Sequence, residues 1–361
     1  MTLRWHTWRD VFRTFNVALG DQGATARGFV YGSPSFMQSS QLSRSTRERL
    51  RCPACRAKLE IGDEHYLCTT PECGARFPVV NGVPVLLNEG ASIFTADDFV
   101  RRHDTTFHLQ LSSRERLLHG LLDLLPSISS SVGAKRNYGQ FGDSLLKDTP
   151  APKVLIVGGS ILGEGMEVLA ANPSFELIST DVSFGPLTAL VCDAHDIPFE
   201  NETFDGVIVQ AVLEHVVDPY RCVEEIHRVL KKRGLVYAET PFMQQVHMGR
   251  YDFTRFTHSG HRRLFRHFDE IASGPVCGPG MALAWSYQYF LLSFTTSRAL
   301  RGLIRAFTCL TSFYLKYFDF YLIDKSPAFD AASGFFFIGR KEGNVLLDRE
   351  LIKYYKGALS D

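Results

Sequence analysis

Short apolar runs alternate with segments of helical periodicity along the chain from residue 153 onward. Five of these runs have the length of strands, and their sequences are KVLIV, ELIST, ALVCDA, FDGVIVQA and GLVYAETP. Helices are expected at 164–171 and about 219–231, and two later strands at 270–275 and 334–339. Apolar strands that alternate with helices form parallel sheets through right-handed crossovers. The pattern therefore predicts an α/β fold, with a seven-stranded sheet and helices on both faces.

The remaining segments differ in character from this α/β region. We predict a loosely ordered arm at 1–48, a cysteine-bearing unit at 49–90, a helical linker at 91–150, the α/β domain at 151–345 and a tail at 346–361. The linker is expected to be helical over about 95–125 and to end at Pro126. An aromatic-rich helical insert interrupts the domain at about 282–324, and we expect its aromatic residues to be mostly core.

Composition narrows the classes of function. The chain has 361 residues, of which 45% are hydrophobic and 22% charged, as in ordinary globular proteins. Its formal net charge is zero, which argues against a protein that binds nucleic acid over its whole surface. We find neither a signal peptide nor a run of roughly 18 apolar residues that would span a membrane. We therefore expect a cytoplasmic protein.

The eight cysteines fall into two groups. Four are scattered among apolar neighbours, where a buried free thiol is expected: Cys192, Cys222, Cys277 and Cys309. The other four are clustered, with the spacing C-x2-C, twelve residues, then C-x4-C: Cys52, Cys55, Cys68 and Cys73. Two cysteine pairs on turns can place four thiolates around a tetrahedral zinc ion, so we predict a closed structural zinc site. His65 is a competing ligand, and four unrelated thiols are the alternative.

The cysteine segment resembles the zinc ribbon of the small tRNA-methyltransferase activator family. The resemblance rests on CPAC, the second cysteine pair and the stretch FPVVNGVPVLL at 77–87. The C-x4-C spacing departs from the commoner C-x2-C, so the loop at 69–72 is expected to bulge. In that family the ribbon often precedes a methyltransferase domain, so the identity of the domain that follows here tests the resemblance.

Small and acidic residues follow the predicted strands. Gly158 and Gly159 end the first strand within VLIVGGSILGEG, and Asp181 ends the second about twenty residues later. Asp193 follows the third strand and Gln210 ends the fourth. At the carboxyl ends of parallel strands, glycines admit a ligand close to the backbone and a carboxylate accepts bonds from ribose hydroxyls. Taken singly, each aspartate also fits a helix cap or a turn.

The order of these elements resembles class I S-adenosylmethionine-dependent methyltransferases. Residues 150–270 carry DAHDIPF, FDGVI, LEHV and a fifth strand in the sequence typical of that family, whose fold is Rossmann-like. The resemblance implies that Gly158, Gly159 and Ser160 line the methionine portion of the cofactor. It further implies Asp181 at the ribose, Asp193 and Ala194 at the adenine, and Gln210 near the sulfonium. Ile156 and Ser160 replace the family's acidic residue and middle glycine, and LKKRG replaces L-[KR]-P-G-G. A NAD site is disfavoured because the third glycine is misplaced.

Methyl transfer requires an acceptor in line with the sulfonium and, for some acceptors, a general base. We name His215 in LEHV and His258 in HMGRYDFTRFTHSGHRRLF as catalytic candidates, with His247, Asp252 and Arg255 beside them. A packing role for His215 and a solvated helix start for the second stretch are the alternatives. The stretch YDFTRFT-x3-HRRLF also resembles methyltransferases of bacterial glycan and cell-envelope biosynthesis.

We therefore expect an S-adenosylmethionine-dependent methyltransferase that acts on a small-molecule or glycan acceptor and holds a structural Zn²⁺. One alternative is an rRNA or tRNA methyltransferase whose ribbon holds RNA through a basic edge: Arg44, Arg47, Arg49, Arg51, Arg56 and Lys58. Zero net charge disfavours it. The other alternative is a cofactor-degenerate binding scaffold. The insert is a candidate for covering a bulky acceptor, or for peripheral membrane or protein contact.

Overall fold

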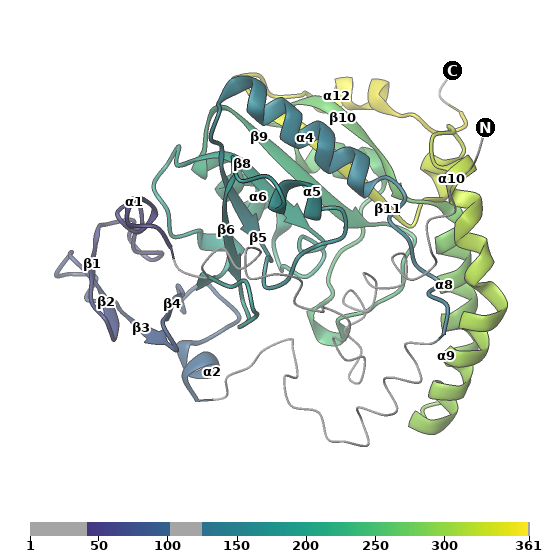
Figure 1. The fold of residues 1–361 in the computed structure, drawn as a ribbon, viewed down its shortest axis with the longest axis horizontal. Helices are drawn as coiled ribbons and strands as arrows, with labels where there is room; N and C mark the ends of the chain where they lie inside the picture. Colours follow the sequence, from purple (N-terminus) through teal and green to yellow (C-terminus); the bar gives the residue numbers. More distant parts are fainter. Residues whose placement is uncertain (1–41, 102–124, 360–361) are drawn as a thin grey trace.

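The computed structural model describes residues 42–101 and 125–359 (Figure 1). The arm up to residue 41 and most of the helix expected at 95–125 lie outside the described residues. The central sheet holds the strands β5 (Lys153–Val157), β6 (Glu176–Asp181), β7 (Leu190–Cys192), β8 (Phe204–Gln210), β9 (Leu230–Pro241), β10 (Phe268–Cys277) and β11 (Gly334–Lys341). Their order is β7-β6-β5-β8-β9-β11-β10, with β11 antiparallel to both of its neighbours. The predicted α/β class is confirmed.

Helices cover both faces of this sheet because the strands are apolar on both sides. On one face, α4 (Ala134–Asp148) packs Tyr138, Phe141 and Leu145 against β5, β8 and β9 (Figure 1). On the other face, α6 (Pro219–Val229) contributes Cys222 and Ile226 to a second apolar cluster. The remaining short elements are α5 (Glu167–Ala170), η3 (Ala194–Asp196), η4 (Gly249–Tyr251), α7 (His258–Leu264), α12 (Asp348–Leu351) and η6 (Ile352–Tyr354).

The helix expected at 164–171 is shorter in the structure, where α5 covers only Glu167–Ala170. Gly165 has φ +87°, which a right-handed helix does not accommodate. A Cβ at Gly165 would also lie 2.8 Å from the Ala134 carbonyl carbon, at the start of α4. The glycines therefore extend the loop after β5 and delay the helix.

The cysteine-bearing unit joins the central sheet as a continuation of it. It comprises α1 (Arg44–Arg47), β1 (Leu59–Ile61), β2 (His65–Cys68), β3 (Arg76–Val80), β4 (Val83–Leu86) and, after it, α2 (Ala96–Val100). Strands β1 to β4 pair antiparallel, and β4 then pairs parallel with β7 at Val85↔Val191 and Leu86↔Cys192. The described strands thus form one eleven-stranded sheet.

Arginines of the cysteine-bearing unit make ion pairs with the α/β domain. Arg49 and Arg51 both pair with Glu200, the first at 2.9 Å. Arg56 lies 2.9 Å from Glu225 and donates to the Ile197 carbonyl oxygen at 3.0 Å. Three of the basic residues considered for RNA contact are therefore used to attach this unit to the rest of the chain.

The insert is helical as predicted, but the expectation that its aromatic residues are mostly core is wrong. It comprises α8 (Pro279–Leu292), α9 (Arg298–Ser312), η5 (Phe313–Phe318), α10 (Asp319–Leu322) and α11 (Ala328–Ala331). Helix α8 buries Met281, Ala284 and Trp285 with Ile128. Among the described residues of the insert, large apolar side chains remain exposed, at 75% for Phe294 in the turn after α8 and 68% for Leu303 on α9. Helices α8 and α9 lie at the end of the molecule opposite β1–β4 (Figure 1). No described helix is long and apolar enough to cross a membrane.

Candidate functional site

A pocket lies at the carboxyl ends of β5, β6 and β7. Its wall includes four residues predicted to bind cofactor: Gly158, Asp181, Asp193 and Ala194. Further lining comes from the loop after β8 and from the segment after β4: Val212, Val216, Val217, Ile93 and Phe94. The site lies where an open parallel sheet binds its ligands, beyond the carboxyl ends of the strands.

The loop after β5 brings backbone to the pocket. Gly158 has φ +74°, and a Cβ there would lie 2.1 Å from Val212 Cγ2. Only glycine fits such a position without strain or a shift of the neighbouring loop. The Gly159 N–H donates to the Thr180 carbonyl oxygen at 2.9 Å, which ties the turn to β6. The loop after β5 therefore forms a tight turn at the pocket, although its glycine pattern is unusual.

Asp181 is held in place by the same loop. Its Oδ2 accepts from the Ser160 N–H at 3.0 Å, and its Oδ1 accepts from Ser183 Oγ at 3.0 Å. Burial raises the pKa of Asp181, against the effect of these hydrogen bonds. Gly159 and Ser160 thus support Asp181 and do not belong to the pocket wall.

Both carboxylate oxygens of Asp193 accept hydrogen bonds. Oδ1 accepts from the backbone N–H of His195 at 3.0 Å and lies 2.6 Å from His195 Nδ1, while Oδ2 accepts from Ser92 Oγ. The Asp218 N–H donates to His195 Nε2 at 3.1 Å, so Nδ1 carries the proton of the neutral ring. Sequence reasoning missed His195, although it stands inside the DAHDIPF motif, and it missed Ser92 because the signal is purely tertiary.

Gln210 lies in a polar network beneath the loop and outside the pocket wall. Its Nε2 donates to Glu239 Oε2 at 2.9 Å and to the Glu164 carbonyl oxygen at 3.2 Å. Its Oε1 accepts from the Tyr138 hydroxyl at 3.0 Å. Burial raises the pKa of Glu239 to about 7. A cofactor contact of Gln210 stays a prediction, and a network of this kind had no signal in the sequence.

Two histidines meet a buried carboxylate next to the pocket. His215 Nε2 lies 3.1 Å from His247 Nε2 and 3.7 Å from Glu214 Oε1. Burial raises the pKa of Glu214 to about 8 and, with the nearby His247, lowers that of His215 to about 4. In the absence of a further ligand, both groups are therefore mainly uncharged at neutral pH. The Phe253 N–H donates to the Glu214 carbonyl oxygen at 2.7 Å, which joins the loop around η4 to this cluster.

Asp252 and Arg255 support this cluster from the η4 loop. Arg255 Nη2 donates to Asp252 Oδ2 at 2.8 Å, and Arg255 Nη1 donates to Asp252 Oδ1. Burial opposes ionisation of Asp252, but the hydrogen bonds from Arg255 and from the His247 N–H prevail and lower its pKa to about 2. Three further residues named from the sequence, His247, Asp252 and Arg255, are thus brought beside His215.

His258 is placed elsewhere. It is buried at the start of α7, where its Nε2 lies 2.9 Å from Ser273 Oγ and its ring packs edge-on against Phe329. It does not line the pocket. A catalytic role for His258 stays a prediction that this placement does not support.

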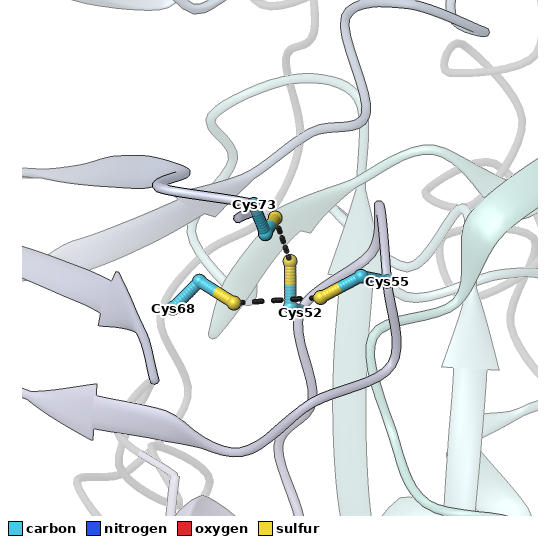
Figure 2. Close-up of side chains that lie close together, drawn as sticks. All are labelled: Cys52, Cys55, Cys68 and Cys73. Atoms are coloured by element: carbon cyan, nitrogen blue, oxygen red, sulfur yellow. Dashed lines mark hydrogen bonds between the residues drawn. The ribbon is translucent and has the colours of Figure 1, made fainter. Parts of the chain in front are cut away.

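The four clustered cysteines converge at one end of the ribbon (Figure 2). Their Sγ atoms all lie within 4.8 Å of one another, with Cys55 and Cys68 at 3.4 Å and Cys52 and Cys73 at 3.8 Å. Arg56 and Gly74, each directly after a cysteine, have φ of +65° and +56°. These left-handed residues turn the chain tightly behind the sulfurs. The donor set and spacing fit a tetrahedral zinc ion.

Comparison with known proteins identifies the domain. Residues 159–238 match the family model described as methyltransferase domain. This match and the observed strand order support a class I S-adenosylmethionine-dependent methyltransferase domain.

Two curated relatives are similar over part of the chain. The ubiquinone/menaquinone biosynthesis C-methyltransferase UbiE of Geotalea daltonii is 27% identical over 29% of this chain and 52% of its own length. The demethylmenaquinone methyltransferase of Symbiobacterium thermophilum is 32% identical over 30% of this chain and 43% of its own length. The chain thus spans about half the length of the curated relatives it matches.

Among solved structures, the Burkholderia thailandensis 1,6-didemethyltoxoflavin-N1-methyltransferase is similar with a TM-score of 0.34. Its sequence is 12% identical, and the similarity covers 56% of this chain and 77% of that chain.

Proposed function

We propose that the protein transfers a methyl group from S-adenosylmethionine to a small-molecule or glycan acceptor. The observation that carries the proposal is the pocket at the ends of β5–β7, most of whose lining belongs to the segment that matches a methyltransferase domain. Both curated relatives are named for methylation in quinone biosynthesis, which favours a small-molecule acceptor. The proposal assigns 49–90 to the ribbon and 151–345 to the catalytic domain.

The pocket residues suit the nucleoside part of this cofactor. Gly158 would admit it close to the backbone, Asp181 would accept from the ribose hydroxyls, and Asp193 with Ala194 would face the adenine. The bound cofactor supplies an electrophilic methyl group, so the work of the protein is positioning and exclusion of water. His215, at the pocket's edge, is the candidate to accept a proton from the acceptor.

The ribbon is proposed to be structural. Four thiolates would complete the coordination of a zinc ion and leave no position for a substrate. Two observations disfavour the RNA alternative: zero net charge, and the pairing of Arg49, Arg51 and Arg56 with Glu200 and Glu225. Acids that neutralise these three arginines weaken the basic edge on which RNA contact would depend.

Calorimetric titration with S-adenosylhomocysteine tests the proposal. Wild type is expected to bind at micromolar concentration, and Asp181→Asn to bind at least about tenfold more weakly because the ribose loses a charged acceptor. Asp269→Asn is the matched control, since Asp269 is exposed on β10, away from the pocket. Thermal unfolding without ligand checks that the variants fold. Absence of wild-type binding at millimolar ligand would favour the scaffold alternative instead.

A further inference from the structure

We propose that Glu214, His215 and His247 form a second metal site, which binds a divalent cation of the zinc class. The site is distinct from the four cysteines and is built from the loop after β8 and the segment before η4. The ligands would be one carboxylate oxygen and the two imidazole Nε2 atoms. Three protein ligands of this kind, with an open position for water or substrate, are typical of catalytic zinc sites.

The spacing of the three donor atoms fits one ion between them. The two Nε2 atoms are 3.1 Å apart, and Glu214 Oε1 lies 3.7 Å from His215 Nε2 and 4.0 Å from His247 Nε2. Metal–ligand bonds of about 2.0–2.2 Å in a tetrahedral arrangement separate the ligand atoms by roughly 3.3–3.6 Å. Small adjustments of the side chains would therefore bring all three onto the ion.

The Nδ1 atom of each ring lies close to acceptor oxygens, while the two Nε2 atoms face each other and contact no other protein group by a hydrogen bond among the described residues. His215 Nδ1 donates to the Tyr251 carbonyl oxygen at 2.9 Å. His247 Nδ1 faces Asp252 Oδ2 at 3.4 Å and the Gln245 carbonyl oxygen at 3.3 Å. Without an ion the two Nε2 atoms share a hydrogen bond, and with the proton of each ring on Nδ1 both would present a lone pair to an ion. Carbonyl and carboxylate partners of this kind commonly orient metal-binding histidines.

The burial of Glu214 supports the metal site independently of the two histidines. The residue is only 1% exposed, and among the described residues neither carboxylate oxygen has a hydrogen-bond partner. A buried carboxyl group without hydrogen-bond partners costs free energy in either protonation state, so it calls for a compensating partner. Arg255, whose charge acts on Glu214, is already bound to Asp252. A divalent cation would satisfy Glu214 and both imidazole nitrogens together.

The position of the site suggests which molecule would complete it. Val212, Val216 and Val217, which flank Glu214 and His215 in sequence, line the cofactor pocket. An oxygen of the methyl acceptor, as a hydroxyl or enol, is therefore the class of ligand expected at the open position. This last step rests on the proposed function, whereas the metal site itself does not.

The test counts zinc per chain after equilibrium dialysis against Zn²⁺, by inductively coupled plasma mass spectrometry. Wild type is expected to hold two equivalents, and Glu214→Gln, His215→Ala and His247→Ala to hold one. Asp252→Asn is expected to weaken the second site roughly 10- to 100-fold, the usual effect of an outer-shell partner. His227→Ala is the control and should keep two equivalents, because His227 lies on α6 beside His267 and Phe268.

Glu214→Gln is nearly isosteric, so it keeps the proposal falsifiable even if a histidine variant fails to fold. If folded Glu214→Gln, checked by circular dichroism, still holds as much zinc as wild type, the site does not exist. Binding of S-adenosylhomocysteine is measured on the same samples. Zinc in the second site without binding of that ligand would refute the proposed function and leave the metal site standing.

Discussion

Gly158 shows how a single position shapes the pocket. Its φ is +74°, and a Cβ added to it would approach Val212 Cγ2 to 2.1 Å, so the position has no room for a side chain. The loop after β5 and the loop after β8 therefore meet at this residue, and both contribute to the pocket wall.

Gly158→Ala is accordingly expected to lower the free energy of unfolding by at least about 2 kcal/mol, from backbone strain and overpacking. It should also abolish detectable binding of S-adenosylhomocysteine. Gly139→Ala is the matched control: it lies inside α4 with nothing within 4 Å of the new Cβ, so it should gain about 0.5–1 kcal/mol. Urea unfolding measures both. A neutral Gly158→Ala would contradict the placement of this loop.

Glu239 illustrates a residue whose ionisation the fold opposes. Burial raises its pKa from 4.5 to about 7, although the Tyr237 hydroxyl donates to it. The unfolded chain releases the proton at lower pH than the folded chain does. The stability associated with this group is therefore full below pH 4.5 and is lost as the pH rises through 7.

Glu239→Gln should remove this dependence. Relative to the variant, wild type is expected to lose up to about 1.4 kcal/mol per pH unit, and about 3 kcal/mol in all, between pH 4.5 and 7. Urea unfolding at half-unit steps of pH measures the difference. Glu60→Gln on β1, where the side chain is exposed, is the control and should run parallel to wild type. Parallel curves for Glu239→Gln would mean that Glu239 ionises freely in the folded protein.

At the scale of elements, β4 links the ribbon to the pocket at the ends of β5–β7. The strand pairs with β7, and the chain that leaves it brings Ser92 to Asp193 and Phe94 to the pocket wall. The Phe94 ring also stacks on Tyr251, with centroids 5.9 Å apart. The ribbon therefore anchors part of the wall of a pocket that otherwise belongs to the α/β domain.

Disrupting the contact between the segment after β4 and the pocket should weaken binding of the cofactor. Phe94→Ala is expected to raise the Kd for S-adenosylhomocysteine about tenfold, from lost apolar contact. Removal of zinc from the cysteines with a chelator should raise it as well, because the segment after β4 would lose its support. Phe294→Ala is the control, since that ring is 75% exposed on the distant insert. An unchanged Kd in both treatments would show that the ribbon does not support the pocket.

At the scale of the whole molecule, charge decides which partners are favourable. The formal net charge is zero, and three arginines of the ribbon are committed to acids of the α/β domain. Among the described residues, the insert exposes large apolar side chains, with exposed fractions of 62% for Phe290, 68% for Leu303 and 70% for Tyr321. An apolar acceptor or surface fits such a molecule better than a phosphate backbone does.

We therefore expect no RNA binding by the full chain at about 50 mM salt, where counterion release would make phosphate contacts strong. Electrophoretic mobility shift with structured RNA measures this. Arg49→Glu and Lys58→Glu should both leave the result unchanged. A shift that weakens as salt increases, and that Lys58→Glu reduces, would restore the RNA methyltransferase alternative.

The sequence predicts the fold class, the cysteine cluster and part of the pocket wall, for simple physical reasons. Apolar strands and helical periodicity determine the α/β class, because each element must bury its apolar side locally. The paired cysteines indicate their cluster, because thiolates that share a metal must lie on short turns. Gly158, Asp181 and Asp193 line one pocket because parallel strands bring their carboxyl ends to one edge, and their contact with a cofactor stays a prediction.

Only the tertiary structure decided the rest. The pairing of β4 with β7, the closing of the pocket by Phe94 and the exposure of the insert depend on contacts between segments far apart in the chain. The cluster of Glu214, His215 and His247 depends on such contacts as well. The two histidines lie 32 residues apart, so no local sequence pattern connects them. Sequence periodicity specifies which side of an element is apolar, whereas packing alone specifies what that side meets.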